Sequence, residues 1–214
     1  MIIFDLDDTL IDTSGVVTPF KMKECFRRLI ALGVKCPLSS FNELIENNKK
    51  SSKSKDAIIA FAKKYFASDE QIEQALQVLT APLPDSFHIP MTTHAQEILE
   101  YYRGRYPMAI VTGGHPPYQM DKLEKAGIER AFFSMIAIPE DSVKKPCYRE
   151  IQKEFNIPSN EIWVCGDRIE VDLRPAFELG MNTIHMKWGR GASLEEKWVN
   201  YSINNLHALK DIIR

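Results

Sequence analysis

The chain begins Met1-Ile-Ile-Phe-Asp5-Leu-Asp7-Asp8-Thr9-Leu10, an apolar run that leads directly into three carboxylates. An apolar run of this kind is typical of a buried strand. Acidic residues just beyond the C-terminal end of such a strand lie where α/β folds bind ligands. Carboxylates this close together repel one another unless a cation or a proton lies between them. Asp5 and Asp7 are therefore the first candidates for catalysis.

The composition of the 214-residue chain is that of an ordinary globular protein, with 44% apolar residues and a formal net charge of −2. This charge favours neither nucleic acid nor an acidic membrane as a partner. No window approaches the ~20 apolar residues of a membrane span, and the N-terminus lacks a basic flank, so we expect neither a membrane helix nor a signal peptide. Four cysteines without C-x-x-C spacing are typical of reduced thiols in a cytoplasmic protein. Nothing in the composition indicates an oligomeric state.

Residues 18–80 carry apolar side chains at helical spacing and no strand signal. Two pairs of residues within this stretch have the spacing of a capping box, in which a hydroxyl and a Glu or Gln satisfy the first backbone donors of a helix. These pairs are Ser40 with Glu43 and Ser68 with Gln71. The pattern predicts a compact helical unit of several short helices.

Three prolines between residues 82 and 90 end this helical stretch, because proline cannot continue a helix. We therefore predict an α-helical domain over residues 14–88. It would be inserted into a core formed by residues 1–13 and 89–214.

Beyond residue 90, strands alternate with helices, which is typical of a parallel sheet with right-handed crossovers. The predicted strands are Met108–Val111, Phe133–Ile138, Ile162–Cys165 and Thr183–His185. The N-terminal strand joins the same sheet. The fold class is therefore α/β, with a doubly wound parallel sheet and a helical insertion after its first strand.

Polar or charged residues follow the C-terminal ends of four of these strands. They are Asp5 and Asp7, then Thr112-Gly113-Gly114, then Lys144-Lys145-Pro146, and finally Gly166-Asp167-Arg-Ile-Glu-Val-Asp172. In a doubly wound sheet such strand ends converge on one crevice. Convergence of the four segments, rather than any one of them, predicts a site.

The charges at these strand ends favour phosphoryl transfer. Together, Asp5, Asp7, Asp167 and Asp172 would place up to four negative charges in one crevice. A hard divalent cation such as Mg²⁺, which prefers oxygen ligands, would relieve their repulsion. Lys145 would supply a fixed positive charge. A carboxylate in such a site can attack phosphorus and form an aspartyl-phosphate.

The segment Thr112–Gly114 offers a hydroxyl, and at Gly113 and Gly114 it offers backbone amides that a ligand can approach closely. Such donors stabilise the charge that develops on a transferring phosphoryl group. A second carboxylate two residues beyond the nucleophile can protonate the leaving oxygen and then activate water. Asp7 has this spacing from Asp5.

Four segments resemble, in the correct order, the four motifs of the haloacid dehalogenase-like hydrolase superfamily. They are Phe4-Asp-Leu-Asp-Asp-Thr-Leu10, Ile110-Val-Thr-Gly-Gly114, Lys145-Pro146 and Gly166-Asp-Arg-Ile-Glu-Val-Asp172. The resemblance implies a Rossmann-like core, and the helical insertion matches in position and length the small α-helical cap of many family members.

The resemblance also implies catalytic roles. Asp5 would be the nucleophile and Asp7 the general acid/base, and a lysine would steady the nucleophile and the phosphate. Lys144 and Lys145 can both fill the lysine role, and we prefer Lys145 because family members usually place this lysine directly before proline. The dehalogenating members lack the second acid, so Asp7 favours a phosphatase. The short match Gln119-Met-Asp-Lys-Leu123 is similar to phosphatases with helical caps that act on sugar phosphates and nucleotides.

Binding roles follow from the same resemblance. Thr112, with Gly113 and Gly114, would bind the phosphoryl oxygens together with Lys145. Magnesium would be bound at Asp5, Asp7, Asp167 and Asp172. Within that set Asp5, Asp167 and the backbone carbonyl of Asp7 would contact the ion, and Asp172 would support them from outside.

We therefore expect a cytoplasmic, Mg²⁺-dependent phosphatase that hydrolyses a small phosphorylated metabolite through an aspartyl-phosphate. One alternative is a phosphotransferase or phosphomutase of the same superfamily, and another is a non-catalytic module that binds a phosphorylated ligand. Dehalogenation is a third alternative. The sequence does not identify the substrate or the cap residues that select it.

Overall fold

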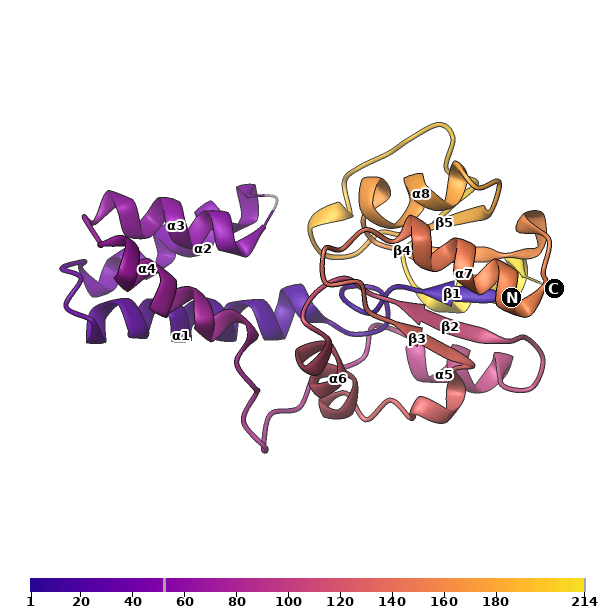
Figure 1. The fold of residues 1–214 in the computed structure, drawn as a ribbon, viewed down its shortest axis with the longest axis horizontal. Helices are drawn as coiled ribbons and strands as arrows, with labels where there is room; N and C mark the ends of the chain where they lie inside the picture. Colours follow the sequence, from indigo (N-terminus) through magenta and orange to yellow (C-terminus); the bar gives the residue numbers. More distant parts are fainter. Residues whose placement is uncertain (52, 214) are drawn as a thin grey trace. The chain divides into compact units, whose positions relative to one another are not determined.

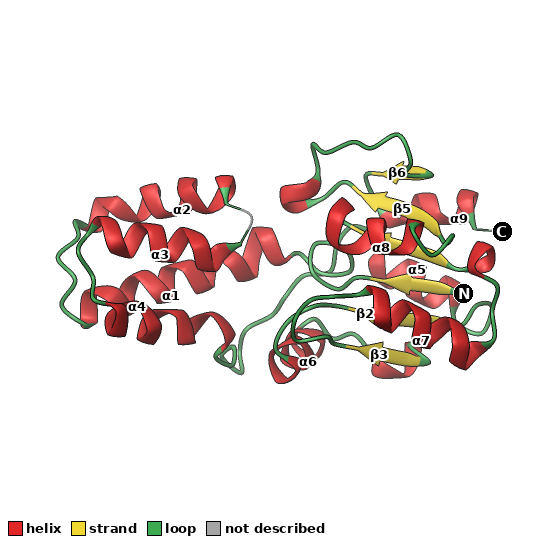
Figure 2. Cartoon of the chain, turned by 45° about the horizontal axis from the view of Figure 1, so that its top comes forward, coloured by secondary structure: helices red, strands yellow, loops and turns green. Residues whose placement is uncertain are grey.

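The computed structural model describes residues 1–51 and 53–213 (Figures 1 and 2). The chain forms two compact units. One comprises Met1–Ser14 and the chain from Leu83 onward, and the other comprises Gly15–Pro82. Each unit has its own hydrophobic core.

The first unit is built on one six-stranded sheet, in which every pair of neighbouring strands is parallel. Its strands are β1 (Ile2–Phe4), β2 (Met108–Val111), β3 (Met135–Ala137), β4 (Trp163–Gly166), β5 (Asn182–Met186) and β6 (Tyr201–Ile203). Their spatial order is β3-β2-β1-β4-β5-β6. This order confirms the predicted α/β, Rossmann-like core, and it places the ligand crevice beside β1, where the chain reverses direction across the sheet.

Sequence patterning located five of the six strands. Strand β3 is shorter than the predicted Phe133–Ile138, and β6 was not predicted. The β6 residues are three in number, and two of them are exposed at the edge of the sheet. So short and polar a strand carries no apolar run from which to recognise it.

Helices cover both faces of the sheet (Figures 1 and 2). They are α5 (Ala95–Tyr102), α6 (Pro116–Lys125), α7 (Lys145–Phe155), α8 (Arg174–Phe177) and α9 (Leu209–Ile212). Helices α7 and α8 pack on the sheet face that carries Ile3, Val111 and Val164. Helix α5 lies on the opposite face, where the Tyr102 hydroxyl donates to the Leu209 carbonyl of α9 at 2.8 Å. Strand β1 is buried on both faces, which explains its continuous apolar sequence.

The second unit is entirely helical over its described residues. Its helices are α1 (Thr18–Ala31), α2 (Phe41–Lys50), α3 (Ser54–Lys64) and α4 (Asp69–Leu76). Aromatic rings form the centre of its core, with the Phe26 ring 5.4 Å from that of Phe41 and 5.8 Å from that of Phe61.

The structure confirms one of the two predicted capping boxes. Ser68 and Gln71 exchange side-chain and backbone hydrogen bonds at the start of α4. The box predicted from Ser40 and Glu43 is wrong. The Ser40 hydroxyl instead donates to the carbonyl of Pro37 at 2.6 Å, because a short 3-10 turn over Leu38–Ser40 precedes α2 and already supplies its first backbone bonds.

The boundaries between the units differ from the prediction. Ser14 belongs to the first unit, and the core resumes at Leu83 rather than at residue 89. The segment after Leu83 is tied to α6, because the Leu83 amide donates to Asp121 at 2.9 Å and the Ile89 amide donates to the Lys125 carbonyl at 3.0 Å. These contacts are long-range in sequence, so the proline pattern did not indicate them. None of the helices described here combines the length and apolar character that crossing a membrane requires.

Candidate active site

The ends of β1 and β4 lie side by side and bring three carboxylates together. The Asp5 amide donates to the carbonyl of Cys165 at 2.9 Å, which continues the pairing of the two strands into the loops. Asp5, Asp167 and Asp172 each offer an oxygen, and these three oxygens lie within 4.8 Å of one another. All three residues are buried. The structure thus joins the first and last of the four predicted segments.

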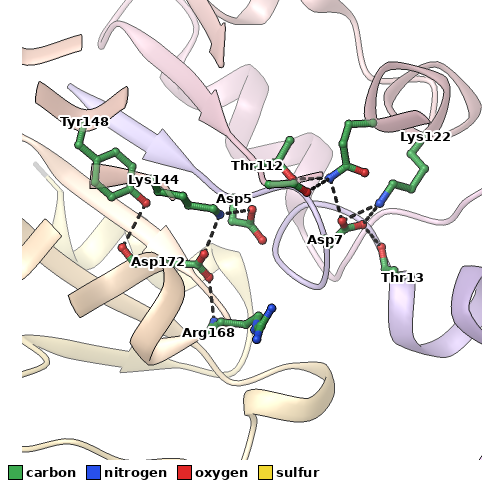
Figure 3. A network of polar contacts seen from close by, with 11 residues as sticks. Asp5, Asp7, Thr13, Thr112, Lys122, Lys144, Tyr148, Arg168 and Asp172 are labelled. Carbon is green, nitrogen blue, oxygen red and sulfur yellow. Dashed lines mark hydrogen bonds and ion pairs between the residues drawn. The ribbon is translucent and has the colours of Figure 1, made fainter. Parts of the chain in front are cut away.

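Of the described lysine side chains, one places its ammonium against this acidic cluster. Lys144 Nζ is 2.6 Å from Asp5 Oδ1 and 2.6 Å from Asp172 Oδ1 (Figure 3). Asp172 is held in place by two further contacts, since its Oδ2 accepts from the Arg168 amide at 2.9 Å and its carbonyl accepts from the Tyr148 hydroxyl at 3.1 Å. Lys144 therefore bridges the predicted nucleophile and a fixed carboxylate of the fourth segment.

The choice of Lys145 over Lys144 is corrected by the structure. Lys145 is the first residue of α7, and its ammonium pairs with Glu178 at 2.6 Å, with a third of its side chain exposed. The buried positions of α7 are Tyr148 and Ile151. Lys144 shares their helix face, because the three residues have i, i+4, i+7 spacing, whereas Lys145 at i, i+3, i+6 lies off that face. That spacing was visible in the sequence, and it identifies the inward-facing lysine better than the position of the proline does.

Burial and mutual repulsion dominate the electrostatics of the cluster. Burial, with Asp172 and Asp7 nearby, raises the pKa of Asp5 to about 7 although Lys144 opposes the shift. Burial and the charges of Asp172 and Asp5 raise the pKa of Asp167 well above its usual range. The same two carboxylates overcome burial at Lys144 and raise the pKa of its ammonium. Among the side chains that the structure describes, one cation thus faces three acids that are costly to ionise together.

The donor set fits a hard divalent cation. It offers carboxylate oxygens alone, their negative charge exceeds that of the single ammonium, and they converge within 4.8 Å. Mg²⁺ is commonly held by one or two carboxylates while it keeps several waters. Asp5 and Asp167 are the carboxylates best suited to it, because Asp172 is already engaged by Lys144 and by the Arg168 amide.

The carboxylate of Asp7 is held by a separate set of donors (Figure 3). Lys122 Nζ lies 2.6 Å from both of its oxygens, Gln119 Nε2 donates to Oδ2 at 3.0 Å, and the Thr13 hydroxyl donates to Oδ1. Burial would raise the pKa of Asp7, but Lys122 and these hydrogen bonds outweigh it and lower the pKa. The side chain of Asp7 is therefore no part of the acidic cluster. Its backbone carbonyl remains the predicted metal ligand.

Sequence reasoning did not identify Lys122. Lys122 and Gln119 lie on the buried face of α6 together with Leu123, although both are polar. Polar residues at the inward positions of an amphipathic helix are unusual unless they are paired. The sequence signal that both face inward is their i, i+3 spacing next to Leu123. Both residues lie in the segment Gln119–Leu123, which resembles phosphatases with helical caps.

The Thr112–Gly114 segment lies beside Asp7. Thr112 is buried, and its hydroxyl oxygen accepts from Gln119 Nε2 at 2.6 Å. Gly113 is required by packing, because a Cβ there would lie 2.5 Å from the Ser142 hydroxyl oxygen. The Gly114 amide donates to the Pro139 carbonyl at 3.1 Å, so the expectation that this amide is available to a ligand is wrong.

The turn over Gly189–Gly191 packs directly on the acidic loops, a role that the sequence did not reveal. A Cβ on Gly191 would lie 2.0 Å from the carbonyl oxygen of Asp167, and one on Gly189 would lie 2.4 Å from Asp8 Oδ2. The carbonyl of Asp167 is also 3.1 Å from Nε2 of the buried His185. Close backbone approach, rather than a phosphate loop, explains these glycines.

Comparison with known proteins agrees with this geometry. The family model described as haloacid dehalogenase-like hydrolase matches residues 2–186. A glyceraldehyde 3-phosphate phosphatase of Pyrococcus furiosus is 26% identical over 100% of this chain and 92% of its own. Two solved structures share the fold over 100% of this chain and 97% of their own. One is a predicted phosphoglycolate phosphatase of Haemophilus somnus (TM-score 0.77, 15% identity), and the other is a HAD-hydrolase, YfnB, of Bacillus subtilis bound to magnesium (TM-score 0.71, 17% identity).

The two adjacent lysines give a matched pair of variants. Lys144→Met should lower the free energy of unfolding of the metal-free protein by about 3–5 kcal/mol, because the buried carboxylates of Asp5 and Asp172 lose the ammonium that pairs with both. Lys145→Met should lower it by less than about 1 kcal/mol, because its ion pair lies at the surface. Urea denaturation of both variants measures the difference, and equal losses would contradict the assignment of Lys144.

Asp167→Asn should stabilise the metal-free protein at pH 8, on the order of 1 kcal/mol. An acid whose pKa rises on folding destabilises the native state as pH climbs from its unfolded pKa towards its folded pKa. The neutral amide of asparagine removes this cost, because it does not repel Asp5 and Asp172. Mg²⁺ should raise the melting temperature of the unaltered protein but not that of the Asp167→Asn variant. A variant that melts lower without Mg²⁺, yet still responds to it, would show that Asp167 is not a ligand.

Proposed function

Since the chain belongs to the haloacid dehalogenase-like hydrolase family, we propose that it is a phosphatase that hydrolyses small phosphorylated metabolites through a phosphorylated Asp5. The observation that carries the proposal is the position of Asp5. Its buried carboxylate lies 2.6 Å from the Lys144 ammonium and shares one cluster with Asp167 and Asp172. A nucleophile, a fixed cation and a cation site in one crevice are the parts that phosphoryl transfer needs.

Magnesium is the cofactor we propose, held by Asp5, Asp167 and the backbone carbonyl of Asp7. When bound, it neutralises charge on the phosphoryl oxygens and offsets the repulsion between the acids. Support comes from the all-oxygen donor set and from the magnesium in the solved structure of the B. subtilis protein.

In the first step an oxygen of Asp5 bonds to phosphorus while the ester P–O bond breaks. Lys144 holds the Asp5 carboxylate in place and lies where its charge can stabilise the oxygens of the phosphoryl group. For this step Asp7 must carry a proton, against the ion pair with Lys122 that favours its ionised form. It gives that proton to the departing oxygen, which leaves as an alcohol. The products of this step are the alcohol and phospho-Asp5.

In the second step water attacks the phosphorus of phospho-Asp5 and gives a proton to Asp7. The P–O bond to Asp5 breaks, and phosphate departs as the Asp5 carboxylate is restored. Lys122 favours the ionised form of Asp7, which suits the water-activating step. Gln119 contacts both Asp7 and Thr112, so one side chain positions the acid/base and the phosphoryl-binding hydroxyl together.

We assign substrate selection to the helical unit over residues 15–82, as a cap inserted after the first motif. The P. furiosus relative is named for glyceraldehyde 3-phosphate, so triose phosphates are the first substrates to test. A phosphate-release screen over triose phosphates, other sugar phosphates and nucleotides, with and without Mg²⁺, separates the alternatives. A phosphotransferase would consume substrate with little phosphate release, and a binding module would show no turnover.

Asp5→Asn should lower the hydrolysis of an aryl phosphate by about three orders of magnitude or more, because the amide cannot form the phosphoenzyme. Asp85→Asn, at an exposed aspartate, is the matched control and should retain activity. Circular dichroism checks that both variants are folded. Full activity in a folded Asp5→Asn protein would rule out the proposed nucleophile.

Lys122→Met should lower kcat by about tenfold to a hundredfold, which is a part of the roughly 10²–10⁴ that acid–base catalysis contributes as a whole. KM should change little, because Lys122 acts through Asp7. Lys125→Met, three residues along the same helix, removes looser contacts with the carboxylate and the backbone carbonyl of Asp85 and serves as the control. Steady-state kinetics on both variants tests this, and an equal effect of the two changes would contradict it.

A further inference from the structure

A second cluster of metal-ligating side chains lies outside the acidic site, where the start of α5 meets the turn before α9. His94, Glu97 and His207 each offer one ligand atom, and these atoms lie within 4.8 Å of one another. Two imidazoles approach opposite oxygens of one carboxylate. His94 Nδ1 is 2.7 Å from Glu97 Oε2, and His207 Nδ1 is 2.9 Å from Glu97 Oε1.

We propose that His94, Glu97 and His207 form a second metal site, which binds a divalent transition metal ion of the zinc class. Two imidazoles and a carboxylate are a ligand set that suits Zn²⁺ and its neighbours in the transition series. Mg²⁺ prefers oxygen ligands alone, so we expect it to bind the acidic cluster and the transition metal ion to bind the histidine cluster. This inference does not depend on the proposed phosphatase activity.

The backbone holds the two histidines towards each other. His94 precedes α5 in a left-handed conformation with φ of 68°, which is uncommon for a residue other than glycine. Its neighbours fix it there. The buried Thr92 donates its hydroxyl to the Thr9 carbonyl at 2.6 Å, and the Leu206 amide donates to the Thr93 carbonyl at 3.4 Å. Segments more than a hundred residues apart in the chain are thus tied beside the cluster.

The second histidine is also anchored. The His207 amide donates to the Asn205 side chain at 3.1 Å, which begins the short turn over Leu206–Ala208. Beyond it, the Tyr102 hydroxyl of α5 donates to the carbonyls of Leu209 and Ile213 at 2.8 and 3.1 Å. A metal ion here would join two elements whose backbones are already fixed together, so little conformational entropy would oppose binding.

Metal binding requires a side-chain adjustment that exposed residues can make. Tetrahedral zinc with bonds of about 2.0–2.2 Å places neighbouring ligand atoms about 3.3 Å apart. The contacts of 2.7 and 2.9 Å would need to lengthen by roughly half an ångström. Ligand atoms that are now up to 4.8 Å apart would need to draw together. The three side chains are 39–53% exposed, which gives them this freedom and gives an ion access.

Lys210 competes for the same carboxylate. Its ammonium is 2.6 Å from Glu97 Oε1, and with the two histidines it lowers the pKa of Glu97 to about 2. A metal ion would displace Lys210 from this oxygen. Removing Lys210 should therefore strengthen metal binding, whereas removing either histidine should weaken it.

The test is titration of the full-length protein with Zn²⁺ by calorimetry, in excess Mg²⁺ so that the acidic cluster is occupied. We expect one Zn²⁺ per chain at this cluster, weakened about tenfold or more by His94→Ala or His207→Ala and strengthened by Lys210→Met. His88→Ala, at an exposed histidine outside the cluster, is the matched control and should bind as the unaltered protein does.

Two further readouts keep the test independent of activity. Zn²⁺ should raise the melting temperature of the unaltered protein but not that of His94→Ala, and Co²⁺ should give the visible absorption of a tetrahedral site only when both histidines are present. The proposal is overturned if Zn²⁺ does not bind in excess Mg²⁺. It is equally overturned if the histidine variants bind Zn²⁺ as tightly as the His88 control.

Discussion

The structure depends on one buried ammonium that faces more negative charge than it can neutralise. Lys144 bridges Asp5 and Asp172, and Asp167 completes a cluster of acids that burial makes costly to ionise. Removing polar groups from water in this way destabilises a fold unless they are paired. The chain therefore holds, at the end of its central strand, a site whose charge is complete only with a further cation. Stability given up in this way is common at functional sites.

Topology explains how residues so far apart in sequence reach this site. Strand β1 lies between β2 and β4, and the chain reverses direction across the sheet beside it. The loops after these strands must therefore meet, whichever residues they carry. Helices α6 and α7 then deliver Lys122 and Lys144 from opposite sides, one to Asp7 and the other to Asp5 (Figure 3). The two lysines give the two aspartates of the first motif different environments and hence different proton affinities.

Much of this was predictable from local patterns, and the failures share a physical cause. The apolar run before Asp5 and the motif order established the α/β core, since buried parallel strands have a distinctive composition. The preference for Lys145 over Lys144 rests on motif spacing, which places the lysine directly before proline. Helical periodicity, extended back from the buried Tyr148 and Ile151, gives Lys144 as the residue that faces inward. Strand β6, the Gly114 amide and the boundary at Leu83 depend on contacts between distant segments. Periodicity within a short stretch of sequence does not indicate such contacts. Lys122 was missed for another reason, because charged residues are seldom buried.

The most direct measurement is a crystal structure of the protein with Mg²⁺ and beryllium trifluoride, which mimics a phosphoryl group on an aspartate. We expect beryllium bonded to an Asp5 oxygen, Mg²⁺ between Asp5 and Asp167, and the Lys144 ammonium beside the fluorides. We also expect Lys145 to stay at the surface with Glu178. Beryllium trifluoride bound elsewhere, or Lys145 in place of Lys144 against Asp5, would contradict the account.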